Sequence, residues 1–99
     1  MPKFKDLAES TLDEVFNLVE TKYKEFEVDF EDENIKIESL KGTLVYILSI
    51  HEPTSEIWLA SPVSGAHHFQ LRSSDPILWV STRDENINLF KLLEEELGN

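Results

Sequence analysis

The order in which hydrophobic periods follow one another along the chain limits its fold more than any other feature. From Phe4 to about Tyr23 apolar residues recur at helical spacing, and from Phe26 the pattern changes to the alternation of a half-buried strand. Several β-rich segments follow, and helical spacing returns in a last apolar stripe of Leu89, Phe90, Leu93 and Leu97. Consecutive strands between two helices favour an antiparallel sheet, because parallel crossovers need alternating strands and helices. We therefore expect an α+β fold, a two-layer α-β sandwich with the N- and C-terminal helices packed on one face of an antiparallel sheet.

Turn residues divide the region between the helices into short strands. The expected strands cover residues 25–31, 35–37, 43–50, 56–61, 66–71 and 77–80. The segment 43–50 is rich in β-branched and aromatic residues, so we expect a central strand with much of both faces covered. We expect Trp79 in the core. For the last helix, which should run to Leu97, the expected capping side chains are Asp84, Glu85 and Asn86.

The composition bounds the kind of protein and its partners. A chain of 99 residues that is 40% hydrophobic has the size and apolar content of one small domain covering residues 1–99. Its 20 acidic and 9 basic residues give a net charge of −11, which opposes binding to nucleic acid and to anionic membranes. It has no cysteine, which excludes thiolate metal ligands and a cysteine nucleophile. No apolar stretch approaches the roughly 18 residues of a membrane span, so we expect a soluble protein suited to cations or basic surfaces.

Carboxylates gather on one face of the first expected helix and continue on the strand after it. On the helix, an arc of about 80° holds Asp6, Glu9, Asp13 and Glu20. The outward side of the strand adds Glu25, Glu27 and Asp29. Carboxylate oxygens are suitable ligands for iron, calcium and magnesium ions. A charged helix face is also an ordinary solvated surface, and the pattern alone leaves both interpretations open.

The neighbourhood of Trp58 is the second candidate site. Trp58 alternates with Ile57 and Leu59, so if those two side chains face the helices, the indole stands on the outer face of the sheet. Such a tryptophan either contacts a partner or is covered by a neighbouring side chain, and the sequence leaves both open. His67 and His68 are adjacent in an expected strand, so they project to opposite faces and cannot share one metal ion.

A family resemblance is carried by the segment around this tryptophan. Residues Ile57 to Gly65 read IWLASPVSG, with a Glu52-Pro53 turn before them and His68-Phe69 after them. This block resembles the sheet signature of the frataxin family. LAESTLD at Leu7 to Asp13 is similar to the first frataxin helix, and LLEEEL at Leu92 to Leu97 is similar to the last. The resemblance covers nearly the whole chain.

The resemblance implies a function. Frataxins are small α+β proteins of mitochondria and of some bacteria that support iron–sulfur cluster assembly. They bind Fe²⁺ and Fe³⁺ weakly at an acidic ridge and dock on the complex of cysteine desulfurase and iron–sulfur scaffold protein. The resemblance thus implies an iron-binding accessory protein, a monomer, in the mitochondrial matrix or a related organelle after processing, or in a bacterial cytoplasm. Ferroxidase activity and iron storage by oligomers are attributed to some members and form one alternative; an acidic interaction module without a metal role is another.

The resemblance also assigns site residues. The metal residues that it implies are Asp6, Glu9, Asp13, Glu20, Glu25, Glu27 and Asp29. The partner-binding residues that it implies are Ser49, His51, Trp58 and His68. The chain departs from the family at Ser10, Asn17 and Thr21, where other members often carry acids, and at Ser49, Ile50 and His51, where many carry Asn-Lys-Gln. His68 stands at a commonly basic position, so docking is expected to depend on pH near neutrality, where imidazole titrates.

Two further expectations concern affinity and stability. Carboxylates along a convex helix offer no convergent cage, so iron should be held weakly. The chain ends two residues after Leu97, whereas many frataxins continue with a tail that fills the groove between the helices. On this resemblance we expect less apolar burial and a stability at the low end of the roughly 5–15 kcal/mol typical of globular proteins.

Overall fold

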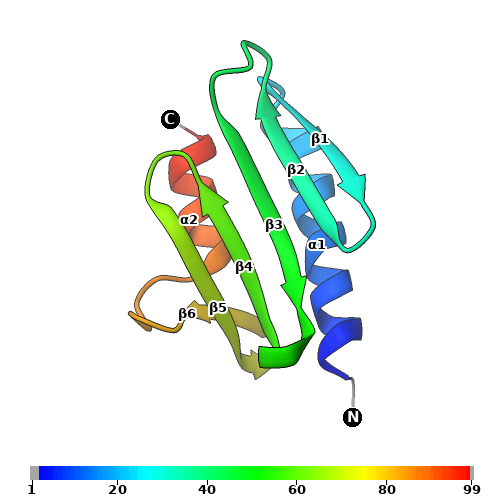
Figure 1. Cartoon of the computed structure of the whole chain (residues 1–99), viewed down its shortest axis with the longest axis vertical. Coiled ribbons are helices and arrows are strands. Elements are labelled where there is room, and N and C mark those ends of the chain that lie inside the picture. The colour runs from blue at the N-terminus through cyan, green and yellow to red at the C-terminus, as the bar shows by residue number, and fades with distance from the viewer. Residues whose placement is uncertain (1–2, 99) are drawn as a thin grey trace.

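The computed structural model describes residues 3–98, which form an antiparallel sheet and two helices (Figure 1). The sheet has six strands, each paired with its neighbours in the chain, in the order β1-β2-β3-β4-β5-β6. The helices are α1 (Phe4–Lys22) and α2 (Leu89–Leu97). The strands are β1 (Phe26–Glu31), β2 (Asn34–Ser39), β3 (Val45–His51), β4 (Glu56–Ser61), β5 (Gly65–Ser74) and β6 (Ile77–Ser81). This architecture confirms the expected α+β class.

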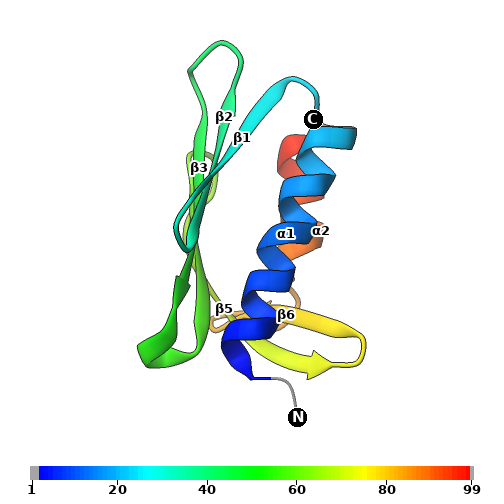
Figure 2. The same ribbon diagram turned by 90° about the vertical axis from the view of Figure 1, so that its right-hand side faces the viewer.

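Both helices pack on the same face of the sheet, so the molecule has two layers (Figure 2). Side chains alternate between the two faces along each strand, and those that face the helices are buried. The core joins the helical residues Ala8, Leu12, Val15, Val19, Leu89 and Leu93 to the strand residues Ile35, Ile37, Tyr46, Leu48, Ile57, Leu59 and Phe69. Neither helix of residues 3–98 is long and apolar enough to cross a membrane.

The other face of the sheet is open to solvent. In β3 the buried side chains are Tyr46, Leu48 and Ile50, whereas Ile47, which points the other way, is 40% exposed. The expectation that both faces of this strand are covered is therefore wrong. The physical reason is that both amphipathic helices bury their apolar stripes on one side of the sheet, and nothing in the described part of the chain packs on the other side.

A sharp bend between β5 and β6 brings the last strand to the first helix. The pairing slips between Leu71 and Ser73, and Figure 2 shows β6 passing beneath the N-terminal half of α1. Trp79 of β6 is 1% exposed, which confirms its expected place in the core. Its indole N–H donates to Thr11 Oγ1 at 2.8 Å, and its ring meets the Phe4 ring edge-on, with centroids 5.9 Å apart. These contacts tie β6 to α1.

The second helix begins later than the capping residues in the sequence indicate. Its N-cap is Asn88, whose side-chain oxygen accepts a hydrogen bond from a backbone N–H of the first turn. Asp84, Glu85 and Asn86, the expected caps, lie in the loop before it, where Asp84 Oδ1 accepts from the Asn86 N–H at 2.9 Å. Asn88 also bridges to Val80. This bridge holds the loop against β6 and moves the start of the helix to Leu89.

The hydroxyl of Tyr46 is a buried polar group with no hydrogen bond partner in the described residues. Burial raises the pKa of Tyr46 to about 12, and the negative charge of nearby Glu96 adds to the rise. Glu96 and Ser61 both lie near this hydroxyl, and Glu96 raises the pKa whereas Ser61 lowers it. An unfolded tyrosine ionises near about 10. The stabilisation from neutral Tyr46 is therefore complete below about pH 10 and is lost as the pH rises through 12.

We predict that Thr11→Val destabilises the protein by about 1–3 kcal/mol, because it leaves the buried indole N–H of Trp79 without an acceptor. Urea unfolding measures the loss. The control Thr11→Ser keeps the hydroxyl, so its Trp79 indole N–H should stay protected from hydrogen exchange, whereas that of Thr11→Val should exchange faster. Equal exchange in the two variants would contradict the assigned hydrogen bond.

Tyr46→Phe is expected to fold at pH 7 with an unfolding free energy equal to or slightly above that of the parent, because it removes an unpartnered buried hydroxyl. Between about pH 10 and 12 the parent should lose roughly 1 kcal/mol per pH unit more than the variant. Denaturant melts at pH 7, 10 and 11.5 check this. Parallel losses in both proteins would show that Tyr46 is not the titrating group.

Candidate metal ridge and docking face

The carboxylates expected on α1 form a row on its solvent side. The apolar stripe of α1 faces the sheet, and the opposite face exposes Asp6, Glu9, Asp13 and Glu20. At 1.5 Å per residue the row is roughly 21 Å long from Asp6 to Glu20. A row of this length on a convex helix presents its carboxylates one after another to solvent.

The C-terminal end of this row meets the first strand. Glu27 and Asp29 are exposed on the outward side of β1. Together with Glu20 they line a hollow of roughly 320 Å³, which Lys24 also reaches. The fold therefore places these three residues around one hollow with a lysine beside them, although within residues 3–98 their side chains do not converge into a group that could hold a metal ion. Glu25 precedes the strand and lies on the rim of a separate hollow of roughly 790 Å³ between the C-terminal ends of the helices.

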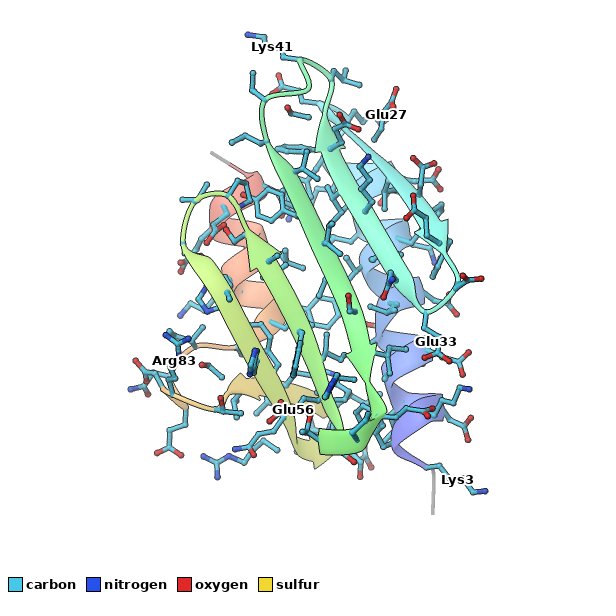
Figure 3. The ribbon with its side chains drawn as sticks, viewed as in Figure 1. Lys3, Glu27, Glu33, Lys41, Glu56 and Arg83 are labelled. Carbon is cyan, nitrogen blue, oxygen red and sulfur yellow. The ribbon has the colours of Figure 1, made fainter. Side chains whose placement is uncertain are left out.

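The N-terminal end of the row lies beside ion pairs that the sequence analysis missed. Lys5 Nζ lies 3.3 Å from Glu33 Oε1 and 3.6 Å from Glu52 Oε1. The hydrogen bond and the charge of Glu33 raise the pKa of Lys5, and Glu52 and Glu9 add smaller contributions. Figure 3 shows Glu33, from the β1–β2 turn, beside α1. Exposed pairs of this kind stabilise little, and because one lysine is shared by two carboxylates, the group of three charges remains net negative.

The described residues hold no preformed metal cage. Within residues 3–98, no group of three or more His, Cys, Asp or Glu side chains converges so that it could hold a metal ion. A cation at the ridge would contact one or two carboxylates and keep most of its water. Glu20 of α1 and Glu27 and Asp29 of β1 line one hollow, so acidic residues of two elements border the same part of the surface.

On the open face of the sheet, Trp58 lies between two histidines. Its indole stacks on the His51 ring with centroids 3.8 Å apart and an interplanar angle of 16°, and on the His68 ring at 4.2 Å and 7°. Ser49 and His68 are its direct partners across the strands. The four residues expected to bind a partner therefore lie together. Trp58 is on the outer face, and its neighbours leave it half-buried. It is therefore partly covered by neighbouring side chains and partly exposed to a partner, so each of the two interpretations left open by the sequence applies in part.

Glu56, which the sequence analysis did not single out, holds this stack in place. Its Oε1 accepts from Trp58 Nε1 at 2.8 Å and from the Thr54 hydroxyl at 3.0 Å, and His68 Nδ1 lies 3.8 Å away. Because Thr54 gives its hydrogen to Glu56, its oxygen accepts from His51 Nδ1 at 2.8 Å. Glu56 precedes Trp58 by two residues in an alternating strand, and this spacing was the signal that both share a face.

A small hollow of roughly 160 Å³ lies beside the stack. Ala60 and Ala66 line it between Ile47 and the Trp58 indole. Exposed apolar surface around an aromatic anchor is the composition typical of the centre of a protein interface. Figure 3 shows Glu56 and Glu27 at opposite ends of the sheet, so the region around Trp58 and the hollow at β1 are separate parts of the surface.

His67 projects to the helix side of the sheet, away from His68, as the alternation predicted. Its Nε2 lies 2.8 Å from Ser64 Oγ. The hydroxyls of Ser64 and Ser61 each donate to the Glu96 carboxylate of α2 at 2.6 Å. These hydrogen bonds attach the loop after β4 to α2, so the serine hydroxyls of this loop have a structural role.

Known proteins resemble this chain over its full length. Residues 1–99 match the family model of the frataxin-like domain. The chain is 42% identical over 76 residues to mitochondrial frataxin of Arabidopsis thaliana, which covers 75% of this chain and 38% of that protein. It is 32% identical over 108 residues to a mitochondrial frataxin-like protein of Leishmania donovani, covering 98% of this chain and 57% of that protein. The chain thus spans between 38% and 57% of the length of these relatives, whose mitochondrial names agree with the expected location.

Solved structures show the same fold. A trimeric frataxin of Saccharomyces cerevisiae complexed with ferrous iron superposes with a TM-score of 0.80 at 27% identity, over 99% of this chain and 88% of that one. Frataxin of Psychromonas ingrahamii gives a TM-score of 0.82 at 17% identity, over 95% and 84% of the two chains, which bears on the fold alone. With the full-length family match and the sheet signature around Trp58, these findings show that the chain belongs to the frataxin family.

Proposed function

We propose that this chain supports iron–sulfur cluster assembly as an accessory protein that offers weakly held iron to a complex of cysteine desulfurase and scaffold protein. The observation that carries the proposal is the pairing of two distinct surfaces on a frataxin-family fold. One is the exposed carboxylate ridge of α1 and β1, and the other is the open sheet face around Trp58. The chain would act in a mitochondrion or a bacterial cytoplasm.

Iron is the cargo in this proposal. Carboxylate oxygens suit both Fe²⁺ and Fe³⁺, and the ferrous complex of the yeast neighbour supports iron as the ion. Glu20, Glu27 and Asp29 are the strongest candidates because they share a hollow. Asp6, Glu9, Asp13 and Glu25 extend the negative surface along the ridge. An ion that keeps most of its water leaves readily, as transfer to an acceptor requires.

The partner would be held by the open face. Trp58 and the hollow beside it supply the apolar centre, and Ser49, His51 and His68 supply polar contacts around that centre. Since both faces of the indole are covered by imidazole rings, a partner would contact the edge of Trp58 and the exposed rims of the histidines. Interfaces of this kind concentrate their binding energy in a few anchors.

Separate variants should divide the two functions in a reconstituted desulfurase and scaffold reaction. Trp58→Ala is expected to lower affinity for the complex at least tenfold and to leave Fe²⁺ binding unchanged, because the indole is remote from the ridge. Glu20→Gln combined with Glu27→Gln is expected to weaken Fe²⁺ binding severalfold and to leave docking intact. Calorimetry and sulfide release with and without iron measure these effects.

The matched control for the ridge variant is Glu14→Gln with Glu94→Gln, which changes the net charge equally at exposed positions away from the hollow. It should keep Fe²⁺ binding near the parent level. If the parent protein changes neither sulfide release nor cluster formation, with or without iron, the proposed function is wrong. If it acts equally without iron, it is an interaction module instead.

A second prediction concerns Glu56. Glu56→Ala removes the acceptor of the Trp58 indole N–H, so the stack should loosen and docking should weaken severalfold. Glu56→Gln keeps a side-chain oxygen and should dock nearly as the parent does. The two tryptophans give two indole N–H signals in NMR. The Trp58 signal should move in Glu56→Ala, and the Trp79 signal, held by Thr11, should stay. An unmoved Trp58 signal would count against the assigned role.

A further inference from the structure

The first strand forms an open edge of the sheet. β1 pairs with β2 on one side, and within residues 3–98 no strand pairs with it on the other. The Leu40 N–H donates to the Glu25 carbonyl at 3.0 Å, which extends the β1–β2 ladder by one hydrogen-bonded pair. Hydrogen-bonded pairs recur at every second residue of an antiparallel ladder. The backbone N–H and C=O groups of Val28 and Phe30 therefore point away from β2, toward the free edge that Figure 2 faces.

An aromatic pair, half-buried Phe16 and exposed Phe30, lies along this edge on the helix side. Phe30, expected from its alternation on the half-buried side of the strand, is 45% exposed. Its ring stacks on Phe16 of α1 with centroids 5.0 Å apart and an interplanar angle of 22°. The hollow of roughly 320 Å³ opens beside Val28, two residues before Phe30 in the same strand. The edge thus combines unpaired backbone groups with exposed apolar surface.

The other side of the edge is strongly negative. Glu27, Asp29 and Glu31 project from β1 onto the open face of the sheet, and all three are exposed. Pairing of two β1 edges would bring two such rows side by side, so charge repulsion opposes a second copy of this chain. A strand with Lys or Arg at alternate positions would instead place each cation beside a carboxylate. Charge complementarity therefore selects a basic occupant.

We propose that the β1 edge receives an extended basic segment of a partner protein as an added strand. Its backbone would pair with Val28 and Phe30, its Lys or Arg side chains would face Glu27, Asp29 and Glu31, and its apolar side chains would cover Phe16 and Phe30. Peptides that add to a sheet edge gain affinity from backbone hydrogen bonds and specificity from alternate side chains. This surface is distinct from the Trp58 face and does not require iron, although it uses Glu27 and Asp29.

The test uses a capped octapeptide of alternating Lys and Val and the full chain without metal. In ¹⁵N-labelled protein the amides of Val28 and Phe30 should shift and gain protection from hydrogen exchange on binding, more than those of Glu27 and Asp29, which already bond to β2. A matched Glu and Val peptide should not bind. Absence of binding by the Lys peptide, or shifts confined to the Trp58 face, would overturn the proposal.

Backbone methylation separates strand addition from simple charge attraction. One peptide carries N-methyl groups on its Val residues and another carries them on its Lys residues. Each therefore lacks the backbone N–H donors along a different edge of the peptide, and the two have equal charge. One of the two should lose at least tenfold in affinity, and in antiparallel addition it is the Val-methylated peptide. Equal affinities would show that charge alone binds the peptide and would overturn the proposal.

Protein variants give a second, independent check. Phe30→Ser should weaken binding of the unmodified Lys peptide severalfold, and Ile47→Ser, which removes an exposed apolar side chain from the open face, should not. Melting curves establish that both variants fold. Equal binding by both variants would show that the peptide does not contact the aromatic pair and would contradict the proposed site. Sedimentation should show a monomer. A dimer that protects the Val28 and Phe30 amides would show that the edge pairs with a second copy of this chain, which would overturn the proposal of a basic partner.

Discussion

The burial of two helical stripes against one face of a single sheet is the interaction on which the other features of this protein depend. It covers the inward side chains of the strands and turns the carboxylate face of α1 to solvent. It also leaves the outward side of β3, β4 and β5 bare, where Trp58 stands. The bend that carries β6 under α1 completes this core, and the hydrogen bond from Trp79 to Thr11 joins the two elements at its centre.

The distribution of charge follows from the same arrangement. A net charge of −11 is spread unevenly, since the carboxylates of α1 and β1 line one border of the molecule. Two lysines lie on this border, Lys5 at one end, where it pairs with Glu33 and Glu52, and Lys24 at the other, in the hollow with Glu20. The ridge is thus a surface of exposed carboxylates from two elements, both of which border the hollow at the start of β1. Such a surface attracts cations and basic segments without enclosing either.

The open face has a different chemistry, because its polar groups are already paired with one another. Glu56 accepts hydrogen bonds from Trp58 and Thr54, Thr54 accepts from His51, and the two imidazoles cover the indole. This network fixes the orientation of the aromatic anchor before any partner arrives, which reduces the ordering that binding must impose. The frataxin-family fold therefore carries a prearranged anchor on one surface and exposed carboxylates on another.

Much of this protein could be read from its sequence, because helical and strand periods are local properties. They determined both helices, all the strands, the burial of Trp79, the outward direction of Trp58 and the acidic row of α1. Tertiary structure alone decided the rest. It left one face of β3 uncovered, moved the start of α2 to Leu89 through the bridge to Val80, brought Glu20 to Glu27 and Asp29, and set Lys5 against Glu33. These features join residues distant in the chain, and no local pattern encodes which distant side chain will become a neighbour when the helices settle on one face of the sheet.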